Sequence, residues 1–289
     1  MIKTIDFPKR EFQTKEELFK ALVDNKKELI SIKKSAEKRA DAISCGYVDA
    51  SINIDVNKSD TPQEQANNID ALNVKVVINT TNFLDSHGDV HVNGIWNKSI
   101  KDNAEKGFLH LQEHDRDFDK IISDNAKGYT KSMAWKQLGF SYDGKTEALI
   151  FESTIERERN EFMLKQYSKG WVKNHSVGMR YVNIELAINS EAEWNKEEKA
   201  IWDEFYPIIA NKEVADERGY FWVVKEAKII EGSAVVMGSN SATPTLENKD
   251  LVLPSLNFIL HPPLKNHILK FIFLISKNYY KNKLFIWAT

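Results

Sequence analysis

The chain has 289 residues, of which 42 % are hydrophobic and 28 % charged, so it is too apolar to be disordered throughout. It has 40 Lys and Arg against 42 Asp and Glu and therefore lacks the basic excess expected of a dedicated nucleic-acid-binding protein. A single cysteine, Cys45, excludes an internal disulfide framework.

The near-neutral charge is unevenly distributed along the chain. From Leu251 onward there are five lysines and no acidic residue, which gives this segment a charge of +5. Because the whole chain carries −2, residues 1–250 carry −7. We expect three parts: a helical arm with a polar linker (1–71), a folded body (72–249) and a basic, apolar tail (250–289).

Neither terminal segment predicts contact with a membrane. Residues 1–6 lack the apolar core of a secretory signal peptide. The apolar run around Ile268–Ile275 is interrupted by Lys270 and falls short of the ~20 residues that span a bilayer. We therefore expect a soluble protein.

The first predicted element is a helix in the N-terminal arm. Thr14 and Glu17 form a capping-box pattern, and apolar residues then recur at helical spacing as far as about Ala42. The many charged residues between them predict a solvated or partner-facing helix. A polar stretch at 57–68, with Pro62 inside it, predicts a linker.

The body is predicted to be rich in β-structure, with two or three helices packed on it. Strands are expected at 74–78, 135–140, 148–151, 172–188 (as one strand or a hairpin), 220–224 and 234–237. Turns are expected at 85–89 and at Asp143-Gly144, and a helix at 157–168 followed by Gly170. A second capping-box pattern, Ser190 with Glu193, predicts an acidic helix within residues 190–218.

Two pairs of histidines have the four-residue spacing of metal ligands on one helical face: His87 with His91, and His110 with His114. The first pair spans Gly88 in a turn, and the second lacks the glutamate order of the zinc proteases. We expect no metal and no other cofactor, and a metal-dependent hydrolase using these four histidines remains an alternative.

Ser176 lies in an otherwise apolar strand, two residues before Gly178. A serine nucleophile requires a base within hydrogen-bond reach. His175 cannot be that base on an extended strand, because neighbouring side chains point to opposite faces. His114 is a candidate base, and a purely structural serine is the alternative.

Four segments, in the same order and spacing, resemble motifs of the tailed-phage prohead proteases, the capsid-maturation family related to the herpesvirus assemblins. They are residues 83–96 with a D-x-x-G-D turn, 111–115 with a strand followed by His-Asp, 173–179 with an x-x-S-V-G-M segment, and 229–240 with an E-x-S-x-V segment. The resemblance covers about residues 74–247. It implies an α+β, β-rich fold in which helices surround a small closed β-barrel.

The resemblance also implies the roles of three residues. Ser176 would attack the peptide carbonyl, and His114 would accept its proton and pass it to the leaving amine. Glu231 would orient the imidazole ring. Backbone N–H groups are expected to form the oxyanion hole, and Asp115 is expected to steady the turn after His114.

The implied function is that of a viral prohead serine endopeptidase inside the immature capsid, in the host cytoplasm. Its substrates would be the major capsid protein, the scaffold and the protease itself, and self-association is expected, without nucleic acid or membrane. A non-catalytic capsid assembly or scaffold protein of the same fold remains an alternative.

Two segments depart from the family pattern. The insertion at 190–218 is longer than expected; it is either a surface elaboration or a substrate or dimer contact that uses Trp194 and Trp202. The tail after residue 250 is a capsid contact, the product of a disrupted reading frame or a segment removed by cleavage.

Overall fold

The computed structural model describes residues 1–37 and 69–250. The predicted linker at 57–68 and the tail from 251 onward lie outside the described residues. The strands are β1 (Ala71–Thr80), β2 (Asp89–His91), β3 (Phe108–Gln112), β4 (Ile121–Ala134), β5 (Lys145–Glu156), β6 (Asn174–Ile188), β7 (Tyr220–Val235) and β8 (Thr245–Asp250). The α-helices are α1 (Lys15–Asp24), α2 (Lys26–Ser35), α3 (Asn97–Asp102), α4 (Arg157–Ser168), α5 (Lys196–Phe205) and α6 (Lys212–Arg218).

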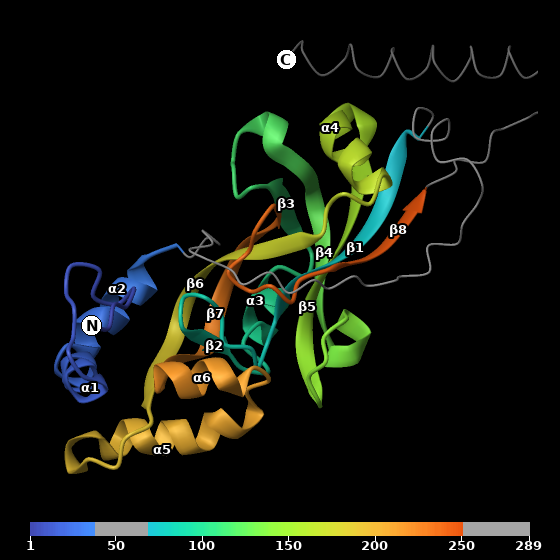
Figure 1. Cartoon of the computed structure of the whole chain (residues 1–289). Helices are drawn as coiled ribbons and strands as arrows, with labels where there is room; N and C mark the ends of the chain where they lie inside the picture. Colours follow the sequence, from blue (N-terminus) through green and yellow to red (C-terminus); the bar gives the residue numbers. More distant parts are fainter. Residues whose placement is uncertain (38–68, 251–289) are drawn as a thin grey trace, which may run out of the picture. The chain divides into compact units, whose positions relative to one another are not determined.

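These strands form one mixed sheet in the order β2-β7-β3-β4-β5-β1-β8, with β6 also paired to β7 (Figure 1). Strand β7 is parallel to β2 and β3 and antiparallel to β6. Strand β4 pairs with β3 through its first residues and with β5 through the rest of its length. The fold is therefore α+β and β-rich, with β7 as the strand that joins three others.

The closed barrel expected from the family resemblance is not formed by the described strands. At one end of the sheet β8 pairs with β1, at the other end β6 and β2 pair with β7, and no ladder among these residues joins the two ends. Instead, the two halves of the sheet pack face to face. A β-carbon at Gly232 in β7 would lie 2.6 Å from the Phe151 ring of β5 and 2.9 Å from Ile78 of β1. The sheet therefore stays open because its end strands are not paired with each other, and side chains between its two halves form the core.

Four of the predicted elements are confirmed with small changes of boundary. The predicted strand at 74–78 lies in β1 and that at 148–151 in β5, while residues 172–188 form a single strand rather than a hairpin. The predicted helix at 157–168 is α4, although its backbone is interrupted at Asn160 (φ −156°, ψ 84°). Gly170 follows this helix with φ +66°.

The strand prediction at 135–140 is wrong. Residues 135–138 form a 3₁₀ turn, η3, in which Trp135 and Leu138 are three residues apart and both buried. The strand that pairs with β5 in this region is β4, which ends at Ala134, directly before η3. The predicted strand at 220–224 is confirmed as the start of β7, which runs continuously from Tyr220 to Val235 and so also contains the first two residues of the predicted strand at 234–237.

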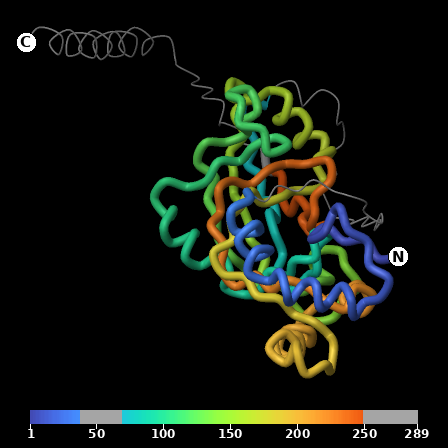
Figure 2. Tube along the Cα trace, turned by 90° about the vertical axis from the view of Figure 1, so that its left-hand side faces the viewer, coloured from blue at the N-terminus to red at the C-terminus, as the bar shows by residue number. Residues whose placement is uncertain are grey.

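The N-terminal arm forms two helices rather than one. The Thr14 hydroxyl accepts a hydrogen bond from the Glu17 backbone N–H at 3.2 Å, as the capping pattern predicts. The helix breaks at Asn25 (φ −105°, ψ 10°), and α2 ends at Ser35, before the expected end near Ala42. Helix α2 packs against β6 (Figure 1), and the tube of Figure 2 shows the same arm in blue.

Lys33 of α2 is buried against the body instead of facing solvent. Its ammonium nitrogen lies 2.7 Å from Asp89 Oδ1 and 3.7 Å from Asp6 Oδ1. It also lies 5.2 Å from the centre of the Trp222 ring. Burial by itself would lower the pKa of Lys33, but Asp89 and Asp6 together raise it above its ordinary value. A buried ion pair therefore fastens α2 to β2 and β7.

The insertion at 190–218 is helical as predicted, but its first helix begins later. The Ser190 hydroxyl accepts from the Ala192 N–H at 3.3 Å rather than from Glu193, so the predicted capping box is not formed. A 3₁₀ turn, η4 (Glu193–Asn195), precedes α5. None of the described helices is long and apolar enough to span a membrane.

Both tryptophans of the insertion contact other parts of the same chain. The Trp202 ring is buried and lies 4.9 Å from the Phe221 ring of β7. The Lys20 ammonium of α1 lies 5.7 Å from the Trp194 ring. These contacts favour the interpretation of the insertion as a structural elaboration of the body.

Candidate active site

The turn after β3 holds His114 in an uncommon backbone conformation. Glu113 and His114 both have positive φ, at 52° and 59°, in the left-handed region that non-glycine residues rarely adopt. Hydrogen bonds fix this turn on both sides: the Glu113 N–H donates to the Ala234 carbonyl at 2.9 Å, and the Val236 N–H donates to Glu113 Oε1 at 2.7 Å. The surrounding structure thus determines where His114 lies.

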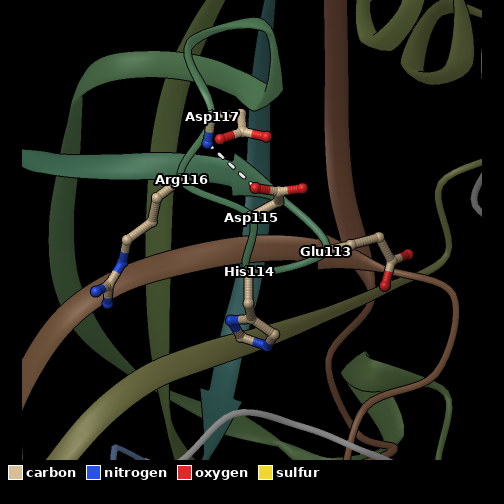
Figure 3. Close-up of a pocket in the computed structure, with 5 residues that line it drawn as sticks. All are labelled: Glu113, His114, Asp115, Arg116 and Asp117. Atoms are coloured by element: carbon tan, nitrogen blue, oxygen red, sulfur yellow. Dashed lines mark hydrogen bonds between the residues drawn. The ribbon is translucent and has the colours of Figure 1, made fainter.

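Asp115 steadies the same turn, as predicted. Its Oδ1 accepts a hydrogen bond from the Asp117 N–H at 3.1 Å. The His114 ring points away from the carboxylates of Asp115 and Asp117 (Figure 3). This segment also lines a surface pocket of about 470 Å³, formed by residues 113–117.

His114 is paired with Glu231 of β7. Its Nδ1 lies 2.6 Å from Glu231 Oε1, and the two side chains are only 5 % and 2 % exposed. A carboxylate at this distance accepts a hydrogen bond, so Nδ1 carries the hydrogen and Nε2 is the basic nitrogen of the ring. The structure brings together the base and the orienting acid that the sequence proposed.

Ser176 lies on the same face of the sheet as Glu231. In the β6–β7 ladder Ser176 is opposite Ser233 and Gly178 is opposite Glu231. Directly opposed residues of antiparallel strands project to one face, and so do residues two apart on one strand. Ser176 is 6 % exposed. Its side chain is thus directed to the face on which the His114–Glu231 pair lies.

Gly178 provides the space for the Glu231 carboxylate. A β-carbon at this position would lie 1.9 Å from Glu231 Oε1, the oxygen that binds His114. Any other residue at position 178 would have to displace that oxygen. The glycine in the serine motif therefore acts on the histidine through the glutamate.

A serine that sequence reasoning did not select, Ser233, completes this group. Its hydroxyl lies 2.6 Å from Glu231 Oε2 and accepts the His114 backbone N–H at 3.1 Å. The available signal was its position two residues after Glu231, because residues at this spacing on a strand share a face.

His175 is excluded as the base, as the strand argument predicts. It points into the core, where its Nε2 lies 2.9 Å from the Tyr167 hydroxyl and its Nδ1 lies 3.0 Å from the Thr243 carbonyl. Burial lowers the pKa of His175 to about 4, although the hydrogen bond to Thr243 acts in the opposite direction. His175 is consequently neutral and lies on the opposite face from Ser176.

His110 belongs to the same buried network. Its ring nitrogens lie 3.0 Å from the Ser153 hydroxyl and 3.2 Å from the Tyr167 hydroxyl. Burial, with a smaller effect of His175, lowers the pKa of His110 to about 3. The network is therefore an uncharged polar element of the core.

The four histidines of the metal-site alternative do not share ligands among the described residues. His91 lies 3.1 Å from Asn79 Oδ1, whereas His110 is held in the core network and His114 by Glu231. Because His110 and His114 lie on a strand and the following turn, their spacing does not place them on one helical face. His87 is the remaining member.

His87 has its ligand nitrogen within 4.8 Å of ligand atoms of Asp85 and Asp89. Asp89 already binds the Lys33 ammonium through Oδ1 and the Tyr181 hydroxyl, at 2.7 Å, through Oδ2. Burial, reinforced by repulsion from Asp89, raises the pKa of Asp85 to about 6. The Lys33 ammonium and the Tyr181 hydroxyl thus already bind one of the two carboxylates of this cluster.

No family model matches this chain, and the comparisons with curated proteins and with solved structures find no match either.

Proposed function

We propose that this chain is a serine endopeptidase of the prohead protease type, related to the assemblins. Ser176 is the nucleophile, His114 the general base and Glu231 the residue that orients the imidazole. The observation that carries the proposal is the 2.6 Å contact between His114 Nδ1 and Glu231 Oε1 on the sheet face to which Ser176 points.

The chemistry follows from this arrangement. With Nδ1–H bound to Glu231, His114 Nε2 takes the proton of Ser176 as its oxygen attacks the peptide carbonyl. The imidazolium formed is stabilised by the buried carboxylate. His114 then protonates the leaving amine, and a water molecule releases the acyl group in a second, equivalent step.

The substrate class comes from the resemblance of four motifs in register rather than from the fold. We propose that the enzyme cleaves the major capsid protein, the scaffold and its own chain inside the immature capsid in the host cytoplasm. Self-association is part of the same proposal.

The test is co-expression of the chain with the capsid protein and scaffold from the same genome. The wild type should shorten its substrate, whereas Ser176→Ala and His114→Ala should fold and leave it intact. Ser132→Ala is the matched control, because Ser132 is exposed on β4 away from the site. Processing by Ser176→Ala would remove Ser176 as the nucleophile.

A serine-directed phosphonate probe separates the enzyme from the scaffold alternative. Labelling of Ser176, identified by peptide mass spectrometry and lost in His114→Ala, is expected for an activated serine. Absence of both labelling and processing in wild-type protein would favour a non-catalytic assembly protein. Loss of activity on strong chelation would favour the metal-dependent hydrolase.

A further inference from the structure

Ser233 joins the two residues that would activate Ser176. Its side chain is fully buried on β7, and its hydroxyl hydrogen is directed to Glu231 Oε2 at 2.6 Å. A hydroxyl has one donor and two acceptor positions. The same oxygen accepts the backbone N–H of His114 at 3.1 Å. One side chain thus contacts both the acid and the backbone of the base.

This contact fixes the orientation of the glutamate. Glu231 is 1 % exposed, and each of its carboxylate oxygens has a partner: Oε1 binds His114 and Oε2 binds Ser233. A carboxylate bound through both oxygens cannot rotate about its last bond without leaving a buried oxygen unpaired. Ser233 therefore keeps Oε1 directed at His114.

The contact also supports the strained turn. His114 has φ +59°, a conformation that persists only where surrounding groups determine it. The hydrogen bond from its N–H to Ser233 is one such determinant, and the bond from the Glu113 N–H to Ala234 is its neighbour.

We propose that Ser233 is a positioning residue, which holds the Glu231 carboxylate and the His114 turn in the geometry that catalysis requires. The catalytic part of this proposal rests on the protease function proposed above. Ser233 lies opposite Ser176 in the β6–β7 ladder and would hold the acid and the base in place without taking part in the reaction itself.

Removal of the hydroxyl has a predictable electrostatic consequence. A hydrogen bond donated to a carboxylate stabilises its charged form. Without it, the Glu231–His114 pair takes up a proton more readily, so the active form disappears at a higher pH. The other charged groups of the pocket are Glu113, Asp115, Arg116 and Asp117, which line it beside His114. These four residues are unchanged in every variant. The neighbouring strands place uncharged residues opposite Glu231 and Ser233: Gly178 and Ser176 on β6, and Leu111 on β3.

The experiment compares wild type, Ser233→Ala and Ser233→Thr in the full-length chain. NMR of histidine-labelled protein follows the titration of the His114 ring, with His114→Gln to assign its signal. For Ser233→Ala we expect the titration midpoint to move upward by about one pH unit, and kcat to fall about 10- to 100-fold with KM unchanged, as for loss of one hydrogen bond to a charged group. Ser233→Thr, which retains the hydroxyl, should restore both.

An unchanged midpoint together with unchanged kcat in folded Ser233→Ala would overturn the proposal. An equal loss of activity at every pH, without a shift of the midpoint, would also overturn it, because that result indicates a structural role only. If Ser233→Ala does not fold, Ser233→Cys keeps the volume, donates more weakly and allows the same comparison. If wild type cleaves no substrate, the protease function fails, and the NMR titration still decides whether Ser233 controls the His114–Glu231 pair.

Discussion

A β-carbon on Gly178 would lie 1.9 Å from Oε1 of Glu231, the oxygen that binds the imidazole of His114. The glycine two residues after the candidate nucleophile is therefore required by the acid on the neighbouring strand. The residue at position 178 in the serine segment must therefore stay small enough to accommodate the Glu231 side chain of the glutamate segment.

Gly178→Ala should disrupt the site without removing any of its functional groups. The methyl group displaces the Glu231 carboxylate, and a misplacement of about 1 Å can reduce the rate roughly 10²-fold. Unfolding experiments should show a destabilisation of about 1–3 kcal/mol from overpacking. In a Glu231→Ala background the same substitution should have almost no further effect on activity. Independent, multiplicative effects of the two changes would contradict the mechanism.

Glu231→Gln tests the charge of the acid while preserving its shape. The amide cannot stabilise the imidazolium, and its N–H₂ group favours the wrong tautomer of His114. We expect kcat to fall by roughly 10²–10⁴-fold, measured as the rate of capsid-protein cleavage. The thermal unfolding of the variant serves as the control for folding. A variant with near wild-type kcat would show that Glu231 is not the orienting acid.

The buried network of His110 and His175 predicts a dependence of stability on pH. The folded chain holds their pKa values at about 3 and about 4, below the ordinary value of about 6.5 in an unfolded chain. The unfolded state thus binds more protons as the pH falls below 6.5. Stability is complete above pH 6.5 and decreases toward pH 4, by about 1.4 kcal/mol per pH unit for each histidine.

His175→Gln removes one of these groups and should reduce that slope by the contribution of one histidine. Urea unfolding between pH 4 and 7 measures it. Asp85, whose pKa is raised to about 6, contributes with the opposite sign, but it is present in both proteins and cancels in the comparison. Identical slopes in the two proteins would mean that His175 is protonated in the folded state.

Lys33→Met tests the anchor of the N-terminal arm. The substitution leaves the Asp89 carboxylate buried beside Asp6 without its ammonium partner, and breaking a buried pair in this way costs about 3–5 kcal/mol. We expect a lower unfolding midpoint and faster amide exchange in α2. Lys34→Met, on the exposed face of the same helix, is the matched control and should change stability by less than about 0.5 kcal/mol. A similar effect of both substitutions would argue against the buried pair.

Local patterns predicted the elements that depend on nearby residues. The helix at 157–168 and its terminal Gly170 follow from helical spacing and a left-handed glycine. The 3₁₀ turn at Trp135 was mistaken for a strand because two buried residues three apart and a short apolar run look alike in a sequence. The break at Asn25 has no counterpart in the helical pattern, which continues across it.

The candidate site was predicted as residues but not as geometry. His114 and Glu231 are 117 positions apart, and their contact depends on the parallel pairing of β3 with β7, which has no local signature. The same holds for the open sheet that replaces the expected closed barrel, because pairing of its end strands depends on residues far apart in the sequence. Ser233 shares a strand face with Glu231, but this spacing did not show that its hydroxyl binds both Glu231 and the His114 backbone.

Strand β7 has a consequence for the order in which the chain is synthesised. Among the described strands, β2 and β6 pair only with β7, and β7 also supplies Glu231. The ribosome makes β7 after β1 to β6. A nascent chain that ends before Tyr220 therefore lacks both the common partner of β2 and β6 and the acid of the site. Pairing of β2 and β6 and assembly of the His114–Glu231 pair therefore both wait for β7, and β8 joins β1 afterwards. Under the proposed function, a chain that ends before β7 lacks the acid of the site and does not cleave proteins in the cell that produces it.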